Sequence, residues 1–415
     1  MSRPATIETL TFGCRLNTAE SEAIAGLAAA AGLTDAVIVN TCAVTQAAER
    51  EALRAIRRLH RERPSARIVV TGCAAQIAPD RFALSGVSHV VGNADKLDPR
   101  TWSGLATRPR VAIAPFAATI GGSDRTPGFA DHTRAFIEVQ QGCDHRCTFC
   151  VIPQGRGPAR SLPAERVLNR ARAALDAGAR EIVLTGVDLT AWGGDLEGAP
   201  RLGALVEILL NRLPGLARLR LSSLDPAEID DALVACLAEP RLMPHVHLSL
   251  QAGDDLILKR MRRRHRVADA YRAAERIRQV RTDIALGADI IAGFPTEDDH
   301  AFTRTLAHVE AIDLPHLHVF PFSPRSGTPA ARMPPVPAAV IKGRAARLRE
   351  AGHAARRRLI ARVAGMVGDV LVERGGDAGY SPHYLRVALD RPAPPGTIVA
   401  ATLAVDDGTL RGVAA

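Results

Sequence analysis

The stretch "QQGCDHRCTFC", residues 140–150, contains three cysteines, Cys143, Cys147 and Cys150, within eight residues. It continues the β-rich run "AFIEV", so the cysteines are expected where a strand ends. Structural zinc takes four ligands and pairs its cysteines as C-x2-4-C, a pattern unlike C-x3-C-x2-C. A 4Fe-4S cluster has four irons and normally four cysteine ligands. Three cysteines therefore leave one iron open, as a catalytic metal site requires.

Five further strand-like runs follow and alternate with helical stretches. They are "EIVLTGVDL" (181–189), "RLRLSSLD" (218–225), "HVHLSLQAG" (245–253), "IALGADIIAGFP" (284–295) and "HLHVFPFSP" (316–324). Alternating strands and helices favour a parallel sheet, and six such units predict a complete or partial α/β barrel. Functional residues of such barrels lie at the carboxyl ends of the strands. After the first strand, these ends carry Asp188, Ser222, Ser223, Gln251 and the "GFP" turn at 293–295.

A second set of three cysteines precedes the barrel. Cys14, Cys42 and Cys73 each end a predicted strand, in "TFGC", "VNTC" and "VTGC", and "HVVGN" predicts a fourth strand. The carboxyl ends of parallel strands share one edge of the sheet, so the three thiols are expected to converge. One cysteine at such a position is commonly a small apolar residue of the core. Three in succession predict a second metal site.

The rest of the chain predicts a linker, a basic helix and a small barrel. Residues 101–132, with scattered Pro, Gly and Thr, read as a linker, and residues 342–362 as a helix with eight Lys/Arg and one Glu. Short strands broken by Gly and Pro then predict a β-barrel. From residue 365 onward there are four arginines and six acidic residues. RNA affinity would therefore come from the preceding helix, from a few placed charges, or from stacking on Tyr380 and Tyr384.

Composition narrows the class of protein. A chain of 415 residues predicts two or three domains. There are 50 arginines and three lysines, and the net charge is +9, which reflects either a bias in arginine usage or a polyanionic partner such as RNA. No apolar stretch is long enough for a membrane span or a secretory signal, so a cytoplasmic protein with reduced thiols is expected. The odd number of cysteines, seven, argues against a disulfide framework.

Together, these motifs resemble the methylthiotransferases of the radical S-adenosylmethionine superfamily. C-x3-C-x2-C after the first barrel strand is similar to the superfamily signature. The matching stretches are "TFGCRLNTAESE", "NTCAVTQAAE", "VTGCAAQ", "GCDHRCTFCVIPQGRGPARS", "LSSLDP", "SLQAGDDLILKRMRR", "DIIAGFPTE" and "FPFSPRSGT". The C-terminal strands resemble a TRAM domain, an RNA-binding barrel. "GCRLN" at Cys14 is most similar to the branch acting on threonylcarbamoyladenosine in tRNA, whereas the isopentenyladenosine branch has "GCQMN" and the ribosomal-protein branch "GCPKN".

The resemblance implies three domains and two clusters. The domains are an N-terminal methylthiotransferase domain with a parallel sheet (1–110), a radical S-adenosylmethionine partial (βα)6 barrel (130–355) and a TRAM-like β-barrel (358–415). The implied 4Fe-4S cluster of the barrel, on Cys143, Cys147 and Cys150, makes a 5′-deoxyadenosyl radical from S-adenosylmethionine. An auxiliary 4Fe-4S cluster on Cys14, Cys42 and Cys73 carries the methylated sulfur.

The implied reaction is methylthiolation of C2 of N6-threonylcarbamoyladenosine at position 37 of tRNA, within the anticodon stem-loop. C2 carries no acidic proton, so radical chemistry is needed, and the cofactor supplies it. Two S-adenosylmethionine molecules are used per product. A flavodoxin or ferredoxin is the implied electron donor, and the sulfur donor is left open.

Several polar residues have two interpretations. Asp188, Ser223 and Gln251 are expected either to bind the ribose and amino-acid parts of S-adenosylmethionine or to cap their strands. Arg156 and Arg160 are expected to meet a cofactor carboxylate, an RNA phosphate or plain solvent.

A basic segment and a seventh cysteine follow along the barrel. The segment "KRMRRRHR" (259–266) suits phosphate contacts or a solvated helix end, and Cys236 is expected in the core. Within the family, the alternatives are modification of isopentenyladenosine in tRNA or of a ribosomal-protein aspartate. From a different class, the alternative is a zinc- or cluster-binding RNA-binding redox sensor without catalysis.

Overall fold

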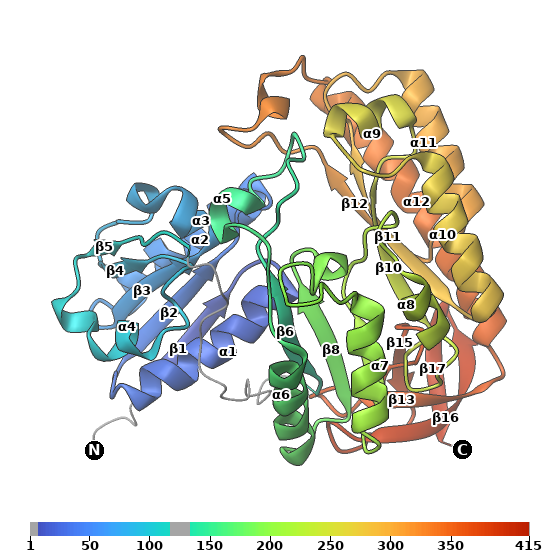
Figure 1. Cartoon of the computed structure of the whole chain (residues 1–415), viewed down its shortest axis with the longest axis horizontal. Coiled ribbons are helices and arrows are strands. Elements are labelled where there is room, and N and C mark those ends of the chain that lie inside the picture. The colour runs from blue at the N-terminus through green and yellow to red at the C-terminus, as the bar shows by residue number, and fades with distance from the viewer. Residues whose placement is uncertain (1–6, 117–132, 415) are drawn as a thin grey trace.

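The computed structural model describes residues 7–116 and 133–414, and Figure 1 shows them as three packed units. The first unit is a parallel five-stranded sheet in sequence order. Its strands are β1 (Ile7–Thr11), β2 (Ala36–Thr41), β3 (Arg67–Gly72), β4 (Val87–Val91) and β5 (Val111–Ala112). Its helices are α1 (Arg15–Ala30), α2 (Gln46–Glu62), α3 (Cys73–Ile77) and α4 (Pro99–Ser103). Every residue of β2 is buried, because helices cover both faces of a parallel sheet.

Part of the predicted linker belongs to this unit. Trp102 is 1% exposed, and its indole N–H donates to the backbone oxygen of Lys96 at 2.9 Å. Val111–Ala112 pairs with β4 as the fifth strand. The linker prediction is therefore wrong for residues 101–112. A two-residue strand and a one-turn helix are too short to show a hydrophobic period. Residues 117–132 of the predicted linker lie outside the described residues.

The second unit is the predicted partial barrel. Six parallel strands form two sheets, β6-β8-β9 and β10-β11-β12, joined by parallel bridges from Leu219 to Leu242 and from Leu224 to Leu248. The strands are β6 (Ala135–Gln141), β8 (Glu181–Gly186), β9 (Arg218–Leu221), β10 (His245–Gln251), β11 (Ala285–Ala292) and β12 (His316–Pro321). A short antiparallel strand that the sequence did not predict, β7 (Arg160–Ser161), pairs with the end of β6.

Helices cover the outside of this barrel, as the apolar faces of their sequences require. They are α6 (Ala164–Asp176), α7 (Leu202–Arg212), α8 (Asp231–Cys236), α9 (Asp255–Met261), α10 (Val267–Val280) and α11 (Asp299–Ile312). The short helix α5 (Ile152–Arg156) instead lies against α3 of the first unit. Single 3-10 turns occur at Pro79–Arg81, Leu105–Thr107, Leu189–Ala191 and Pro329–Arg332. The largest hydrophobic core of the described residues lies between these helices and the six strands.

The third unit is a closed five-stranded β-barrel, as predicted. Its strand order is β13-β14-β15-β17-β16. The strands are β13 (Val367–Val372), β14 (Ala378–Tyr380), β15 (Arg386–Leu389), β16 (Ile398–Asp406) and β17 (Thr409–Ala414). The basic helix α12 (Ala338–Val363) ends three residues before β13 begins. None of the helices in the described part of the chain is both long and apolar enough to cross a membrane.

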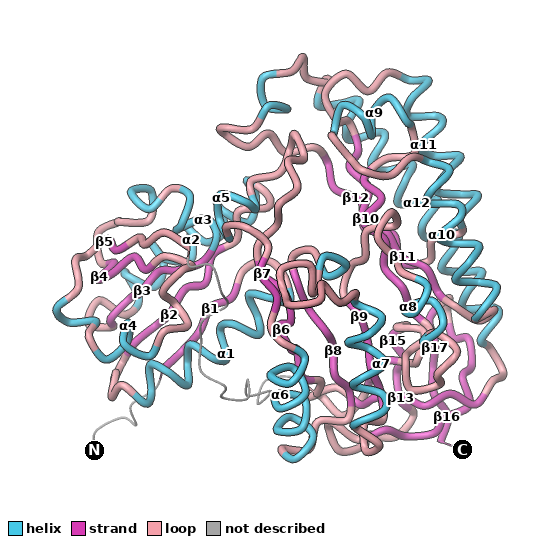
Figure 2. Tube along the Cα trace, in the orientation of Figure 1, coloured by secondary structure: helices cyan, strands magenta, loops and turns pink. Residues whose placement is uncertain are grey.

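The three units pack through specific contacts (Figures 1 and 2). Helix α1 lies against β6, where Ala19, Phe136 and Val183 form one buried cluster. Val151, the residue after the last barrel cysteine, is 3% exposed and belongs to the hydrophobic core of the first sheet. The first sheet and the barrel are therefore one packed structure around the cysteines.

Tyr380 and Tyr384, which are predicted to stack on RNA, are half-buried and pack against other rings of the protein. Their ring centroids are 5.0 Å apart, and the ring of Tyr384 lies 5.1 Å from that of His245, the first residue of β10. The Tyr384 hydroxyl accepts a hydrogen bond from Arg15 at 2.8 Å. Tyr384 thus docks the third unit against the amino end of the barrel, a tertiary contact that strand periodicity cannot reveal.

Candidate metal centres

Cys14, Cys42 and Cys73 lie together at the carboxyl edge of the first sheet. Cys42 and Cys73 directly follow β2 and β3, and Cys14 lies three residues after the end of β1. Cys42 and Cys73 are 5% and 3% exposed, whereas Cys14 is exposed. Gly13, at φ +102°, allows the close approach, because a Cβ there would lie 2.6 Å from the Cys42 sulfur. Burial, reinforced by the neighbouring Cys73 and Cys14, raises the pKa of the Cys42 thiol to about 12. Buried thiols of this kind lose their protons when a metal binds.

Polar groups are directed at these sulfurs. The backbone N–H of Val44 donates to Cys42 Sγ at 3.4 Å, and Asn93 Nδ2 donates to Cys73 Sγ at the same distance. The Cys14 thiol donates to Asn17 Oδ1 at 3.9 Å. Hydrogen bonds to sulfur stabilise thiolates and tune the potential of an iron–sulfur cluster.

Cys143, Cys147 and Cys150 lie on the loop between β6 and α5. The backbone N–H of Cys143 donates to Gly157 O at 3.1 Å, and that of Cys150 donates to Cys147 O at 3.1 Å, so the loop folds back on itself. Burial raises the pKa of Cys143 and brings that of Cys150 to about 11. Burial would also raise the pKa of Cys147, but hydrogen bonds from His145 and Arg263 lower it.

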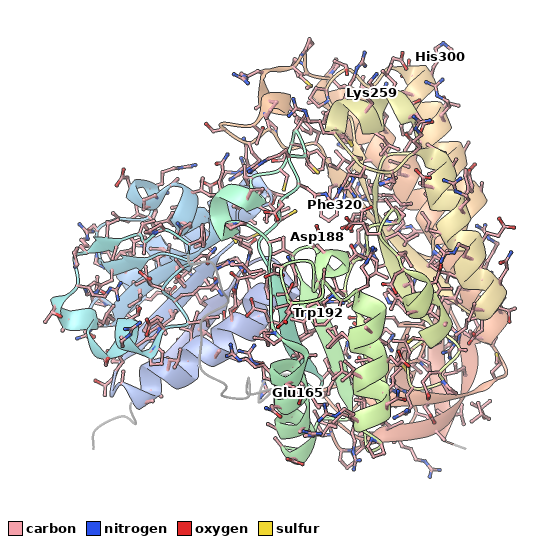
Figure 3. All side chains as sticks on the ribbon, in the orientation of Figure 1. Glu165, Asp188, Trp192, Lys259, His300 and Phe320 are labelled. Carbon is pink, nitrogen blue, oxygen red and sulfur yellow. The ribbon has the colours of Figure 1, made fainter. Side chains whose placement is uncertain are left out.

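Asp188, a predicted cofactor-binding residue, lies against this loop. Its Oδ2 is 2.8 Å from His145 Nε2 and accepts from the Cys143 thiol at 3.7 Å. Its backbone N–H donates to Gln140 Oε1 at 2.8 Å, which holds the strand end in place. Figure 3 places Asp188 at the centre of the molecule, between the first sheet and β12.

Ser223 and Gln251 lie at the ends of β9 and β10, at the same end of the barrel as Asp188. Both are half-buried, and Gln251 has φ 74°. Within the described ranges, neither side chain has a hydrogen-bond partner, which leaves their polar groups available to a ligand.

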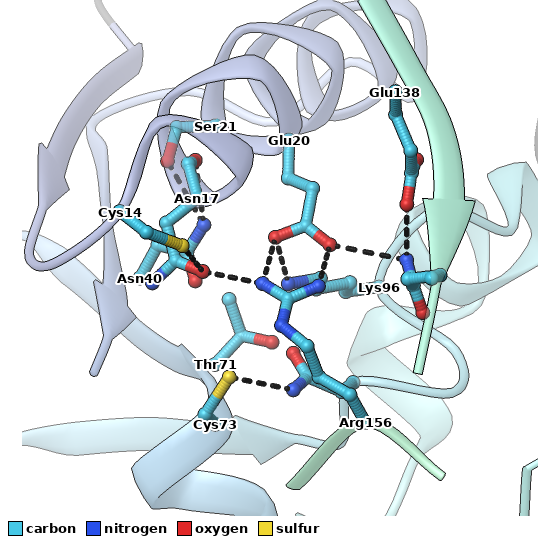
Figure 4. Close-up of polar contacts among 12 residues, drawn as sticks. Cys14, Asn17, Glu20, Ser21, Asn40, Thr71, Cys73, Lys96, Glu138 and Arg156 are labelled. Atoms are coloured by element: carbon cyan, nitrogen blue, oxygen red, sulfur yellow. Dashed lines mark hydrogen bonds and ion pairs between the residues drawn. The ribbon is translucent and has the colours of Figure 1, made fainter. Parts of the chain in front are cut away.

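Arg156 and Arg160 do not face a ligand or solvent, contrary to the prediction. Arg156 is 1% exposed and forms a two-point ion pair with Glu20, at 2.8 and 2.9 Å (Figure 4). Arg160 is 5% exposed and donates to Gln141 Oε1 at 2.9 Å. Their positions after a cysteine loop suggested exposed charge, and only the packing of the first sheet on that loop buries them.

Arg263, which was not predicted as a site residue, also lies at the cysteine loop. Its Nη1 donates to Cys147 Sγ at 3.5 Å, and its Nη2 donates to Asp225 Oδ2 at 2.9 Å and to Ser249 O at 2.7 Å. The side chain is only 8% exposed, although it belongs to the predicted basic segment 259–266. Cys236 is half-buried on α8, with its thiol directed at Gly203 O.

A second polar group inside the barrel was not anticipated. Asp289 Oδ1 on β11 is 2.9 Å from His247 Nε2 on β10 and 3.1 Å from His318 Nδ1 on β12. Burial would raise the pKa of Asp289, but these two hydrogen bonds lower it. Side chains alternate along a strand, so Phe320 shares the face of His318 on β12, and it is 37% exposed. The alternation in "HLHVF" was a signal for this inward face.

Comparison with known proteins identifies the family. The Radical SAM superfamily pattern matches residues 137–309, and that of Uncharacterized protein family UPF0004 matches residues 6–92. Threonylcarbamoyladenosine tRNA methylthiotransferase MtaB of Rickettsia prowazekii is 41% identical over 98% of this chain and 97% of its own length. The MtaB of Thermotoga maritima is 36% identical over 92% and 90%.

Other relatives extend the match. The tRNA-2-methylthio-N(6)-dimethylallyladenosine synthase of Cereibacter sphaeroides is 36% identical over 94% of this chain and 93% of its own. Among solved structures, the radical S-adenosylmethionine methyltransferase TsrM of Kitasatospora setae, with cobalamin and a [4Fe-4S] cluster, has a TM-score of 0.55 at 16% identity. That match covers 76% of this chain and 67% of the other, and it shows the shared fold. The chain therefore belongs to the radical S-adenosylmethionine tRNA methylthiotransferase family.

Proposed function

We propose that this protein methylthiolates C2 of N6-threonylcarbamoyladenosine at position 37 of tRNA. The observation that carries the proposal is the presence of two sets of three cysteines, one at the strand ends of each parallel sheet, in a member of this family. The substrate branch is supported by the printed activity of the relative with 41% identity over 98% of the chain. "GCRLN" at Cys14 points the same way.

The donor sets fit two 4Fe-4S clusters. Three sulfurs at each place, with N–H donors aimed at them and no fourth cysteine nearby in the described chain, suit a cluster with one open iron. Cys143, Cys147 and Cys150 would hold the radical cluster, and Cys14, Cys42 and Cys73 the auxiliary one. When bound, these groups supply the electron for cleavage of S-adenosylmethionine and an open iron for sulfur.

The chain's own residues orient and shield the reactants. We assign Asp188, Ser223 and Gln251 to S-adenosylmethionine, because their polar groups lie at the same strand ends as the cysteine loop. The buried Asp225 fixes Arg263 beside Cys147, where the guanidinium lowers the pKa of that thiol against the effect of burial. Phe320, on the inward face of β12, would stack on the adenine ring of the tRNA.

The proposed domain limits are 1–110, 130–355 and 358–415. The limits near 355 and 358 fall within α12, so the helix would belong to both units. Acting on tRNA, the enzyme would work in the cytoplasm and take electrons from a flavodoxin or ferredoxin. The tRNA anticodon stem-loop would enter between the first sheet and the barrel, where both cysteine sets lie.

Nucleoside mass spectrometry of total tRNA from a strain lacking the gene tests the proposal. The 2-methylthio form of threonylcarbamoyladenosine should disappear and its precursor accumulate. The wild-type gene and Cys236→Ala should restore it, whereas Cys147→Ala should not. If the nucleoside persists in the deletion strain, the substrate is wrong, and isopentenyladenosine and the ribosomal protein are measured next. About eight irons per chain are expected after anaerobic reconstitution, and zinc in their place would favour a non-catalytic sensor.

A further inference from the structure

Three charged side chains are buried together beside the cysteines of the first sheet (Figure 4). Lys96 is 0% exposed, and Glu20 and Arg156 have side chains 1% exposed. Lys96 Nζ lies 2.5 Å from Glu20 Oε2, and Arg156 donates a hydrogen bond to each carboxylate oxygen of Glu20. Glu20 follows Cys14 by six residues on α1, and Arg156 follows Cys150 by six residues on α5. The group therefore joins the first sheet to the loop of the barrel cysteines.

This group is connected to the Cys14 thiol through Asn17. Arg156 Nη2 donates to Asn17 Oδ1 at 2.5 Å, and the same oxygen accepts from the Cys14 thiol. The charges of Cys73 and Cys14 act on Arg156, and Arg156 in turn lowers the pKa of Cys42 against the opposing effect of burial. Burial would raise the pKa of Glu20, but Arg156 and Lys96 lower it to about 2, so Glu20 is ionised.

Such a group is not explained by stability. Burying charges costs several kcal/mol each, and apolar residues of the same volume often serve as well. Two cations face one carboxylate here, so one positive charge lacks a partner within the group. Only three lysines occur in the whole chain, and one of them is Lys96. The nearby acidic groups are the thiols of the first sheet and the carboxyl of Glu138, which Gln141 joins to Glu20. Burial raises the pKa of Glu138, which leaves the thiolates formed on metal binding as the anions that balance this charge.

We propose that the Lys96–Glu20–Arg156 group is the electrostatic partner of the auxiliary site on Cys14, Cys42 and Cys73, holding one net positive charge that raises its reduction potential and favours an anionic sulfur ligand there. The inference rests on the ligand set assigned under the proposed function. Reduction of a cluster adds one negative charge, so a fixed positive charge nearby stabilises the reduced form. Arg156, Lys96 and Glu20 act through the site's electrostatics and are positioning residues.

The charge argument predicts shifts of opposite sign for single substitutions. The test uses full-length protein with Cys143, Cys147 and Cys150 changed to Ala, so that only the auxiliary cluster is loaded, and follows its reduction by electron paramagnetic resonance against poised potential. Arg156→Gln and Lys96→Met, which remove a positive charge, should lower the midpoint potential. Glu20→Gln, which removes a negative charge, should raise it. Arg156→Lys keeps the charge and should leave the potential near that of the parent.

A matched control uses an ion pair of the same type far from the site. Arg63 binds Asp35 and Glu8 at the amino end of the first sheet, with partly exposed side chains. Arg63→Gln should leave the potential unchanged. Each variant is first checked for about four irons per chain. If Arg156→Gln does not take up a cluster, Lys96→Met and Glu20→Gln still test whether the midpoint potential shifts in opposite directions.

The outcomes separate the two proposals. A parent protein that takes up no cluster refutes the assigned ligand set. A parent that loads normally, with Glu20→Gln and Lys96→Met shifting its potential in the same direction or not at all, refutes the charge inference alone. Opposite shifts, together with weaker binding of added sulfide in Lys96→Met, would establish it.

Discussion

The guanidinium of Arg263 donates to Cys147 Sγ at 3.5 Å while Asp225 holds its other nitrogen at 2.9 Å. This places a fixed positive charge beside one cysteine of the loop. Cys147 alone among the three barrel cysteines has a lowered pKa, whereas burial raises the other two. The loop thus contains one thiol prepared to act as the first metal ligand.

Replacing Arg263 by Met should make Cys147 a weaker thiolate. Without the guanidinium, only His145 opposes the effect of burial, and the pKa of Cys147 rises. In metal-free protein at neutral pH, peptide mass spectrometry should show several-fold slower alkylation of Cys147 by iodoacetamide. Arg266→Met, an exposed change in the same segment, serves as the control. An unchanged alkylation rate would show that the arginine does not stabilise the thiolate.

Phe320 is expected to contribute to substrate binding. Stacking of a base on an aromatic ring is worth about 1–3 kcal/mol, so Phe320→Ala should lower kcat/KM for tRNA by roughly 5- to 150-fold. Phe320→Tyr should retain most of the activity. Phe322 packs edge-on against Phe294 and is the matched control, because Phe322→Leu should affect the free energy of unfolding more than kcat/KM. Equal losses for Phe320→Ala and Phe322→Leu would contradict the assignment.

Tyr384 should matter for stability rather than for RNA. Tyr384→Ala removes a large ring packed on His245 and Tyr380, at a cost of about 3–5 kcal/mol of unfolding free energy. Urea denaturation measures that loss. For Tyr384→Leu, which removes the aromatic ring but keeps an apolar side chain, the Kd of the folded protein for tRNA should stay within about twofold of wild type, because the ring packs on His245 and Tyr380. A large loss of tRNA affinity in this variant would restore the stacking interpretation.

His308 should make the protein less stable in mild acid. It is 2% exposed, has no hydrogen-bond partner on either ring nitrogen in the described chain, and burial lowers its pKa to about 4. Between the usual histidine value of 6.5 and about 4, the unfolded chain binds a proton that the folded protein does not. Stability therefore falls as pH falls through that window, by about 2 kcal/mol from pH 6.5 to 5.

His308→Phe, which keeps the edge-on contact with Tyr271, isolates this effect. The free energy of unfolding from urea titrations at pH 7 and pH 5 should fall less in the variant than in wild type. Equal losses in the two proteins would show that His308 does not carry the pH dependence.

The fold was predictable from the sequence because its strands end in recognisable residues. The runs before Cys14, Cys42 and Cys73, and the six runs of the barrel, are apolar, regular and separated by helices. Local periodicity fixes such elements. The short pairing of Val111–Ala112 has no such period, and it forms only because β4 offers a free edge.

The site was predictable only in part, for a related reason. A cysteine at a strand end is placed by its own strand, but Arg156 and Arg263 are buried by segments far away in the sequence. Arg156 meets Glu20 across 136 residues, and Arg263 meets Cys147 across 116. Arginines in a charged or glycine-rich stretch read as exposed until the packing partner is known. Burial by segments far away in the sequence is therefore what could not be predicted for these arginines.

The position of Val151 limits how the first sheet can be exchanged between this protein and its relatives. The residue directly after the last barrel cysteine is part of the first sheet's hydrophobic core, beside Cys73 and Ala74. Grafting the first sheet of a relative onto this barrel, to transfer substrate choice, would place a foreign core around Val151. The first sheet and the cysteine loop must therefore be transferred together. A chimera that folds should join the two proteins after the cysteine loop rather than in the segment between the first sheet and the barrel.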